Sequence, residues 1–406
     1  MRLLVSFAAL FLAVSLLQLS SGGVGPLDVV AGIGLGFSAA EIGLLGSAHF
    51  VGFFVGCWWA PRIMGSVGHS RAFAAFTAAG AIGLLAHTLT EDPYAWAVLR
   101  VASGLCIAGC YTVIESWLQA KVTNETRGRA MGTYRLVDMG GSLVAQLMIG
   151  VLAPLELYMA YNILALLCCA SLLPLTLTTV KQPETPEAPR LRPSLAFVRS
   201  PLAGLAVIVS GLTTAAFRMV GPLYGQGVGL DPDQIGIFLA AFVAGGAVAQ
   251  WPGGWLADRF DRRWVLIWLS AASIVAAAVT VGVANTGTAG VMLASALFGF
   301  TTFPIYSVAA AHAHDFAEPG ERVELSAALL FCYAVGAIAS PLVSSWLIEG
   351  YGPAALFAFI SAAHVLLVAW ALVRMYARPS ATRTNYVHAP RTSFIVGRLT
   401  RRARER

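Results

Sequence analysis

Twelve apolar stretches, each long enough to cross a membrane as a helix, make up most of this chain of 406 residues. A spanning helix needs about 20 mostly apolar residues, and within lipid only helices and closed barrels satisfy every backbone hydrogen bond. Only 11% of the residues are charged, whereas about 25% are charged in soluble domains. The sequence therefore predicts an all-α polytopic membrane protein. The expected spans are residues 3–22, 42–61, 71–90, 94–118, 130–153, 157–179, 200–223, 234–256, 263–283, 289–312, 324–347 and 353–377.

The first stretch, which follows Arg2, has an alternative interpretation as a secretory signal peptide. No good small-residue cleavage site follows it, although Ser20-Ser21-Gly22 is tolerable. The topology also requires this segment as a helix, so we expect it to be the first span.

The longest polar interruption, residues 181–200, contains four prolines and predicts a flexible, extended linker. It divides the spans into six and six. Residues 378–406 are rich in arginine, which predicts a disordered tail that lies on the inner leaflet. We therefore expect an N-terminal six-helix half at 1–180, a cytoplasmic linker at 181–199, a C-terminal half at 200–377 and a basic cytoplasmic tail at 378–406.

The charges between the spans alternate in sign. With the N-terminus inside, the outward segments are 23–41, 91–93, 154–156, 224–233, 284–288 and 348–352. They contain no Lys or Arg, but several acids, among them Asp28. The inward segments hold 23 of the 26 basic residues. The positive-inside rule thus predicts a multi-pass protein of the cell's inner membrane with both termini in the cytoplasm.

The two halves share short strings, as expected for an internal repeat. Glu41-Ile-Gly-Leu opens the second span and Gln234-Ile-Gly-Ile the eighth, and Trp58 and Trp251 follow at the same offset. In the fourth and tenth spans, Gly104 precedes Tyr111-Thr-Val as Gly299 precedes Tyr306-Ser-Val.

One loop carries a specific pattern, Gly254-Trp-Leu-Ala-Asp258-Arg259-Phe-Asp-Arg262-Arg263, between the eighth and ninth spans. Gly254 permits close helix approach, Asp258 can accept hydrogen bonds, and the last two arginines can reach helix C-terminal carbonyls. We expect Asp258 and Arg259 to form part of a cytoplasmic latch; a plain positive-inside loop is the alternative. The corresponding loop after the second span, residues 61–71, keeps basic residues but lacks the Asp-Arg pair.

This pattern resembles the loop signature of the major facilitator superfamily of transporters. The strings Tyr111–Leu118, Phe303–Asp315 and Arg127-Gly-Arg129 resemble its YcaD-like branch. The resemblance implies twelve transmembrane helices in two six-helix, pseudo-symmetric halves. It also implies secondary transport of a small solute by alternating access, with a site between the halves near the midplane.

Five ionisable residues lie well inside predicted spans: Arg100, Glu115, Arg135, Asp138 and Arg218. A charge at the membrane centre costs about 2.5–3.5 kcal/mol, so such residues usually face the bundle interior. The fourth span places Arg100, Gly104, Ala108, Tyr111 and Glu115 on one face, and the fifth does the same with Arg135, Asp138, Ser142 and Gln146. These stripes predict a polar cavity; an ion-pair network that only holds the helices together is the alternative.

Arg100 begins an R-x-x-x-G string, which in the resembling family is linked to proton coupling. Ser103 stands where that family usually has Gln, which weakens the inference. Glu115 and Asp138 are the candidate proton-carrying carboxylates, and the sequence does not choose between them.

The intramembrane inventory of three arginines and two acids has an excess of one positive charge. An unpaired Arg218, with Arg100 assisting, would suit an anionic or zwitterionic organic solute. Snorkelling of Arg218 to the headgroups competes with this hypothesis. The alternatives for function are efflux of a hydrophobic drug or metabolite and a non-transporting receptor on the same scaffold. The predicted pathway residues are Arg100, Tyr111, Glu115, Arg135, Asp138, Gln146, Arg218 and Tyr306.

The remaining motifs predict no further chemistry. The six cysteines fall in apolar runs without metal-ligand spacing, and no phosphate-binding loop or nucleophile elbow is found. His312 and His314, beside Asp315, are expected to cap a helix at the surface. We therefore expect no enzymatic activity, no cofactor, no metal and no nucleic-acid partner. The expected partners are a solute, the lipid bilayer and, as one option, protons, and we expect a monomer.

Overall fold

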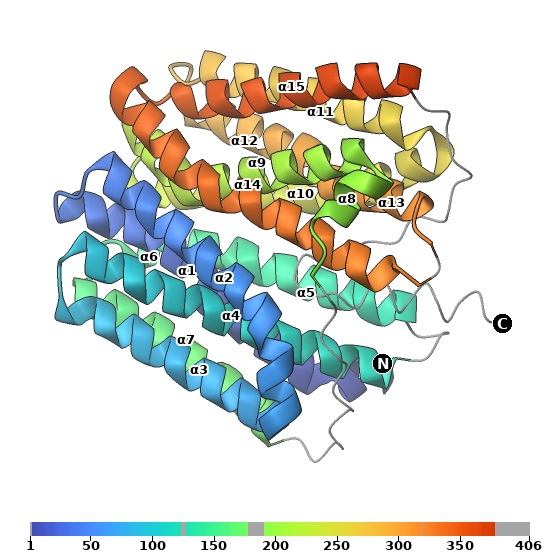
Figure 1. Cartoon of the computed structure of the whole chain (residues 1–406). Coiled ribbons are helices and arrows are strands. Elements are labelled where there is room, and N and C mark those ends of the chain that lie inside the picture. The colour runs from blue at the N-terminus through green and yellow to red at the C-terminus, as the bar shows by residue number, and fades with distance from the viewer. Residues whose placement is uncertain (1, 123–126, 178–190, 319, 378–406) are drawn as a thin grey trace. The chain divides into compact units, whose positions relative to one another are not determined.

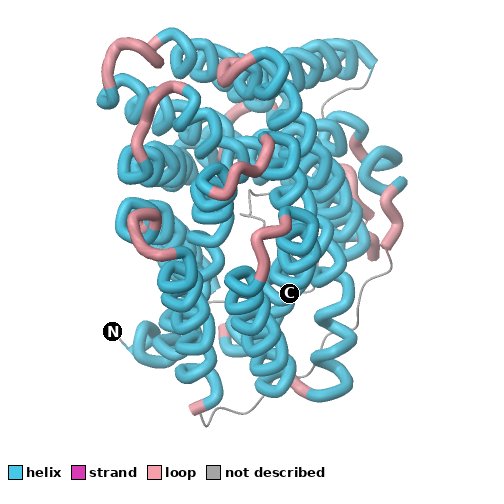
Figure 2. Tube along the Cα trace, turned by 90° about the vertical axis from the view of Figure 1, so that its left-hand side faces the viewer, coloured by secondary structure: helices cyan, strands magenta, loops and turns pink. Residues whose placement is uncertain are grey.

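The computed structural model describes residues 2–122, 127–177, 191–318 and 320–377, and these residues form helices and short loops (Figures 1 and 2). Twelve helices are long and apolar enough to cross a membrane, which confirms the expected number. The first six spans contain α1 (Arg2–Gly34), α2 (Ala39–Val67), α3 (His69–Ala86) with η1 (His87–Leu89), α4 (Pro93–Lys121), α5 (Arg127–Leu147) with α6 (Ile149–Leu152), and α7 (Leu157–Thr176). The others contain α9 (Pro201–Gly227), α10 (Pro232–Arg259), α11 (Arg262–Gly282), α12 (Thr288–Thr302) with α13 (Pro304–Asp315), α14 (Arg322–Tyr351) and α15 (Ala355–Ala377).

The helices fall into two compact units. Unit 1 consists of Met1–Ala188 and Asp231–Ala240, and unit 2 of Pro189–Leu230 and Ala241–Arg406. The half boundaries expected from the linker stay a prediction. The expected basic tail and most of the expected linker lie outside the described residues.

Close helix contact in unit 1 depends on glycine. α2 and α4 lie side by side (Figure 1). A Cβ atom on Gly52 would overlap the carbonyl oxygen of Val101, and one on Gly104 would overlap the carbonyl oxygen of His49. Only a residue without a side chain lets the two backbones approach this closely.

Unit 2 repeats this contact at the equivalent positions of α10 and α12. A Cβ atom on Gly245 would overlap the carbonyl oxygen of Ala296, and one on Gly299 would overlap that of Phe242. The register that pairs Gly104 with Gly299 is the register of the repeated strings. The repeat seen in the sequence is therefore also a repeat of backbone packing.

The equivalent helices α2 and α10 also begin in the same way. Ser38 and Glu41 form a capping box at α2, in which the backbone N–H of each residue donates to the other's side chain. Asp231 and Gln234 exchange the same two hydrogen bonds at the start of α10, at 2.9 and 3.2 Å. Each pair satisfies two backbone donors that the first turn leaves open.

The first span is longer than predicted. α1 continues to Gly34, so the expected outward loop at 23–41 is wrong and the actual connection to α2 is short. Gly22 and Gly23 suggested a break, but they serve close packing: a Cβ on Gly22 would lie 2.9 Å from Cβ of Ala145. As a consequence Asp28 is a buried residue of α1 and not a loop residue.

Two further segments differ from expectation. The tenth span is divided into α12 and α13 at Phe303, because Pro304 has no backbone N–H to donate to the preceding turn. The last residues of the expected extended linker form the short helix α8 (Ser194–Arg199), in which Leu195 and Ala196 are buried.

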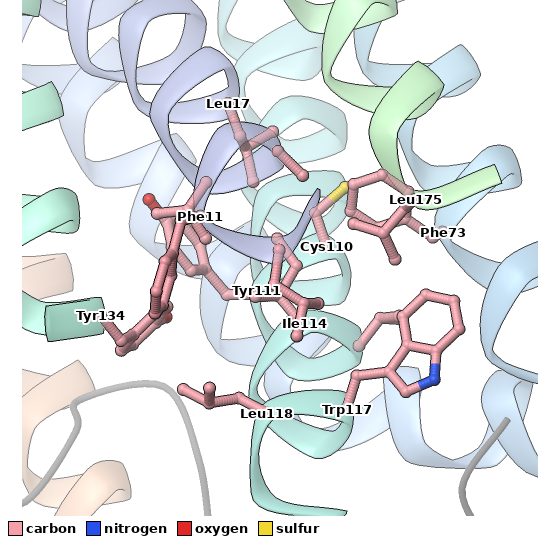
Figure 3. Packing of buried hydrophobic residues seen from close by; sticks show 14 of the residues in the cluster. Phe11, Leu17, Phe73, Cys110, Tyr111, Ile114, Trp117, Leu118, Tyr134 and Leu175 are labelled. Atoms are coloured by element: carbon pink, nitrogen blue, oxygen red, sulfur yellow. The ribbon is translucent and has the colours of Figure 1, made fainter. Parts of the chain in front are cut away.

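Buried hydrophobic residues of unit 1 form two clusters, one of which draws on α1 to α5 and α7. This cluster extends from Phe7 and Leu10 to Trp117 and Leu118. Figure 3 shows Tyr111 and Tyr134 close to Phe11 on one side of this cluster. The polar groups of both tyrosines therefore lie at the edge of an apolar core, next to the polar residues described below.

Candidate functional site

A buried ion pair joins α1 to α4. Nε of Arg100 lies 3.1 Å from Oδ2 of Asp28, and both side chains are almost fully buried, at 3% and 2% exposure. Tyr161 of α7 donates its hydroxyl to Oδ1 of Asp28 at 2.6 Å. One carboxylate thus connects three helices, in the manner expected of charges placed inside a membrane protein.

Aromatic rings surround this ion pair. His87 stacks on Tyr161 with ring centroids 5.1 Å apart, and Trp96 meets both rings edge to face. Nδ1 of His87 lies 2.8 Å from the carbonyl oxygen of Gly83. All three rings are fully buried. Because the Arg100 charge is already compensated within this closed environment, it is not placed to attract a solute anion.

A second polar group lies around Asp138 of α5. Its Oδ1 accepts hydrogen bonds from Nε2 of Gln18 at 2.7 Å and from the hydroxyl of Tyr111 at 3.1 Å. Its Oδ2 pairs with Arg135 one turn earlier, also at 3.1 Å, as the sequence predicted. Three donors, one of them cationic, thus converge on this carboxylate from α1, α4 and α5.

Glu115 and Gln146 lie on the same two helices. Oε1 of the buried Glu115 accepts a hydrogen bond from Tyr134 at 3.2 Å. Gln146 donates to the carbonyl oxygen of Gly22 at 3.1 Å. The predicted polar stripes of α4 and α5 are therefore buried and bonded to α1 and to each other. This arrangement is compatible with both predictions made from the sequence: a polar interior, and an ion-pair network that holds the helices together.

The charge inventory needs a correction. Asp28 is a third intramembrane acid, so three arginines stand against three acids and the expected excess of one positive charge disappears. The error came from the short first span. A buried acid in a helix of small residues carries no local signal, and only its pairing with Arg100 reveals its role.

Unit 2 places Arg218 in a different situation. It lies half-buried in α9, and the described part of the chain contains no acid within ion-pair distance of it. Gly211 lies seven residues earlier, within about 20° of the same angular position on the helix. A Cβ on Gly211 would overlap the backbone carbonyl of Tyr333 in α14. Arg218 therefore emerges from the side of α9 that α14 covers.

Tyr306, the remaining predicted pathway residue, is buried in α13. Its ring meets Tyr333 edge to face, with centroids 5.5 Å apart. By the register of the repeat, Tyr306 is the equivalent of Tyr111 and Tyr333 the equivalent of Asp138. An aromatic pair thus replaces a tyrosine–carboxylate hydrogen bond.

The loop between α10 and α11 is organised by Arg262. Its side chain is 1% exposed, and NH1 lies 2.6 and 2.7 Å from the two carboxylate oxygens of Asp315 at the end of α13. Arg262 also donates to the carbonyl oxygens of Ala257 and Ala311, which confirms that it reaches helix C-terminal carbonyls. From the sequence, Asp315 was considered only as a neighbour of His312 and His314. Its role as the counterion of Arg262 was missed, because nothing in the sequence places α13 beside this loop.

The pair expected to form the latch has other contacts. Asp258 is 54% exposed and lies 3.8 Å from Arg262. Arg259 places its guanidinium carbon 5.4 Å from the centre of the Trp255 ring. Gly254 is buried, as expected for a close helix approach.

Asp261 caps α11 and binds Arg263. Its carboxylate accepts from the backbone N–H of Arg263 at 3.0 Å and from the guanidinium at 2.7 Å. Burial raises the pKa of Asp261, but the hydrogen bonds from the side chain and backbone of Arg263 outweigh it, and the pKa is lowered below its ordinary value.

Neither histidine of α13 is a surface cap, since His312 is buried and His314 is half-buried. His312 is mostly buried and packs against Phe316, and Nε2 of His314 lies 3.2 Å from the hydroxyl of Ser326 in α14. The expectation of surface caps is wrong because α14 covers this end of α13. Within the residues that the structure describes, no three His, Cys, Asp or Glu side chains are grouped so that they could hold one metal ion.

The loop expected at residues 61–71 is wrong, because α2 continues to Val67 and α3 begins at His69. Arg62, which lies within α2, is 4.2 Å above the ring centre of Trp58 and donates to its carbonyl oxygen at 2.7 Å. This arginine is exposed, in contrast to Arg262.

Comparison with known proteins agrees with this architecture. The sequence profile of the Major Facilitator Superfamily matches residues 7–230 and 203–403. The chain is 29% identical over 327 residues to an uncharacterised MFS-type transporter of Enterobacter sp. (strain 638), covering 79% of this chain and 83% of that protein. It is 29% identical over 330 residues to the uncharacterised MFS-type transporter YcaD of Escherichia coli O7:K1, with 80% and 84% covered.

Solved structures show the same fold. The nucleoside transporter NupG superposes with a TM-score of 0.72 at 16% identity, covering 93% of this chain and 100% of that one. A bacterial homologue of the human lysosomal transporter Spinster gives 0.66 at 16% identity, covering 91% and 93%. At these identities the likeness concerns the fold alone.

Proposed function

The chain belongs to the major facilitator superfamily and is a multi-pass membrane transporter, and from this premise we propose that it moves a small organic solute by alternating access. It would act as a secondary transporter in the inner membrane with both termini in the cytoplasm, the orientation that the positive-inside pattern favours. In this proposal the loop Gly254–Arg263 is the cytoplasmic latch, with Arg262 and Asp315 at its centre.

The solute that fits best is anionic or zwitterionic. The carrying observation is Arg218, an intramembrane arginine without an acidic partner among the described residues. Leaving a cation in an apolar environment without a counterion is costly. A carboxylate or phosphate of the solute would supply the missing charge, and a guanidinium binds both groups in a planar fork. Arg100 is not part of this proposal, because Asp28 already compensates it.

Proton coupling, if it drives transport, would use Glu115. Asp28 is paired with Arg100, and Asp138 accepts hydrogen bonds from Gln18, Tyr111 and Arg135. Glu115 is the remaining buried carboxylate of the predicted pathway and has the neutral hydroxyl of Tyr134 as a donor.

A ligand screen tests the class of solute. The purified protein would be heated with a panel of carboxylates, phosphate esters, amino acids and permanent organic cations, since a ligand that binds the folded state raises the melting temperature. Arg218→Gln should abolish the shift caused by anionic or zwitterionic compounds, whereas Arg374→Gln, an arginine near the end of α15, should retain it. A shift by permanent cations that survives in Arg218→Gln would show the proposal to be wrong.

The same compounds, taken into proteoliposomes, test transport and coupling. Glu115→Gln should lose uptake driven by a pH gradient but keep exchange of labelled for unlabelled solute, because exchange needs no net proton movement. Asp138→Asn should impair both. Wild-type gradient-driven uptake in Glu115→Gln would remove this residue from the proposal without affecting the class of solute. Absence of any flux in the wild-type protein would favour the receptor alternative.

A further inference from the structure

We propose that the segment from Arg192 to Arg199, which contains α8, is a salt-sensitive clip that docks on the start of α14 at low ionic strength and is released at high ionic strength. The clip lies within unit 2, on the side that the positive-inside pattern predicts to be cytoplasmic. It contains none of the predicted pathway residues, and the proposal does not depend on the identity of the solute.

Three ion pairs join the clip to the connection between α13 and α14. The guanidinium of Arg199 lies 2.6 Å from a carboxylate oxygen of Glu318 and 2.6 Å from one of Glu321. Arg192 lies 3.1 Å from Glu324. The partners are 119 to 132 residues apart in the chain. The pairs therefore determine how one segment docks on the other, and not the local shape of either.

The acids suit the helix end at which they lie. Glu321 is the N-cap residue of α14, and Glu324 lies in its first turn. Negative charge at a helix N-terminus is stabilised by the helix dipole, so these carboxylates are favourable there even without the arginines. Arg322, which lies between them, is buried. We therefore expect α14 to stay folded when the clip opens, so that α8 is the part that moves.

A small apolar contact accompanies the ion pairs. Leu195 and Ala196 are buried, and α8 lies beside α9 and α14 (Figure 1). The ring of Phe197 lies against Gly204 of α9, where a Cβ atom would be 2.9 Å from it. A helix of six residues is too short to be stable alone. The structure of α8 therefore depends on this contact and on the ion pairs.

The ion pairs of the clip are open to water, which makes them sensitive to salt. The side chain of Arg192 is 56% exposed and that of Glu318 is 64% exposed. Such a pair changes an equilibrium by a factor of about 1.4 to 5, and the Debye length falls from about 10 Å at 0.1 M salt to about 3 Å at 1 M. The pair of Arg262 with Asp315 is buried, and salt screens buried pairs much less.

Hydrogen–deuterium exchange of the full chain in nanodiscs, read by mass spectrometry, measures how often α8 opens. Its hydrogen bonds, such as the one from the N–H of Ser200 to the carbonyl oxygen of Ala196, protect the amides only while the helix is formed. We expect exchange in α8 to be about fivefold faster in 1 M than in 0.1 M KCl, the effect of screening all three pairs. Sucrose at the same osmolality should not accelerate exchange, because it does not screen charge.

Variants separate the ion pairs from the apolar contact. Arg199→Gln removes two pairs, so it should speed exchange about threefold in 0.1 M KCl and reduce the salt effect to below twofold. Arg192→Glu places an acid opposite Glu324 and should also speed exchange. The double variant Arg192→Glu/Glu324→Arg should restore the wild-type rate and salt effect, because the reversed pair can form. Arg374→Gln, near the end of α15, is the matched control and should leave α8 unchanged.

Three results would overturn the proposal. An equal exchange rate of α8 at both salt concentrations would show that the apolar contact holds the helix without the ion pairs. A double variant as fast as Arg192→Glu would show that no specific pairing is involved. Exchange at the rate of an unfolded peptide in 0.1 M KCl would show that α8 is not docked. Exchange in α14, measured in the same samples, identifies any variant that is misfolded.

Discussion

Units 1 and 2 share a backbone arrangement but differ in the side chains at its centre. In both, glycines allow the second and fourth helices of the repeat to touch. Unit 1 fills its interior with ion pairs and hydrogen bonds around Asp28 and Asp138. Unit 2 fills its interior with stacked rings, such as Phe217 on Phe242 at 4.0 Å.

This difference shows which part of the repeat is constrained. Backbone contacts without room for a Cβ atom tolerate only glycine, so they are the same in both units. Side chains farther from these contacts can differ as long as volume and polarity are balanced locally. In the proposed function, the charged interior of unit 1 would carry protons and Arg218 of unit 2 would bind the solute.

Changing the shared glycines should have the largest effect. Gly104→Val and Gly299→Val each place atoms inside a facing backbone, so we expect both to reduce folded protein to background, a loss above about 5 kcal/mol. The yield of monodisperse protein in gel filtration measures this. Gly132→Ala and Gly282→Ala, which have open space around them, are the controls. Tolerance of valine in only one unit would show that the packing is not equivalent.

Removing an intramembrane charge should affect the two units unequally. Asp28→Asn leaves Arg100 buried without its counterion, and we expect a loss of about 3–5 kcal/mol. Arg218→Gln removes an arginine that has no acidic partner among the described residues, and stability should stay the same or rise. Melting temperatures in detergent measure both, and the double variant Asp28→Leu/Arg100→Met should recover most of the loss. A larger loss for Arg218→Gln would contradict the comparison.

The equivalent segments should respond differently to lysine. Arg262→Lys cannot keep the bonds to Asp315, Ala257 and Ala311 at once, and we expect a loss of about 1.5–3 kcal/mol. Arg62→Lys keeps an exposed cation over Trp58 and should change stability very little. Thermal unfolding of the two variants side by side measures the difference, and similar losses would mean that the degenerate copy has kept a structural role.

The smallest effect concerns pH and is confined to unit 2. The lowered pKa of Asp261 stabilises the folded state fully above the ordinary aspartate pKa of about 3.9. That contribution is lost as the pH falls through the lower pKa of the folded state. Asp261→Asn should therefore cost up to about 1 kcal/mol at pH 7 and nothing at the acid end. Melting curves from pH 7 to 3 measure it; a difference that grows on acidification would have the wrong sign.

The fold was predictable because it follows from span length and repeats. The twelve helices, the two pseudo-symmetric halves and the superfamily are confirmed. The ends of the spans were less predictable, because glycine can either interrupt a helix or allow close packing of two helices. A single sequence does not distinguish these two roles. Gly22 suggested a loop, and it packs against Ala145 within a continuous helix.

The candidate site was predictable only where partners lie on one helix. Arg135 and Asp138, three residues apart, were expected to pair and do so. The partners of Arg100 and Arg262 lie on other helices, and helix periodicity says nothing about which helices are neighbours. The functional roles of the pathway and latch residues stay predictions.

The position of Asp28 in the first span also has a consequence for biosynthesis. Its hydrogen-bond donor Tyr161 lies 133 residues later in the chain. At a synthesis rate of about 5–20 residues per second, α1 waits roughly 7–27 seconds before that partner has been made. During this interval the carboxylate has neither Tyr161 nor its place in the finished bundle, and a charge inside the membrane is costly, up to about 2.5–3.5 kcal/mol at the centre. We therefore expect the ribosome-bound intermediate to keep α1 within the insertion machinery, or near water, until the later helices arrive.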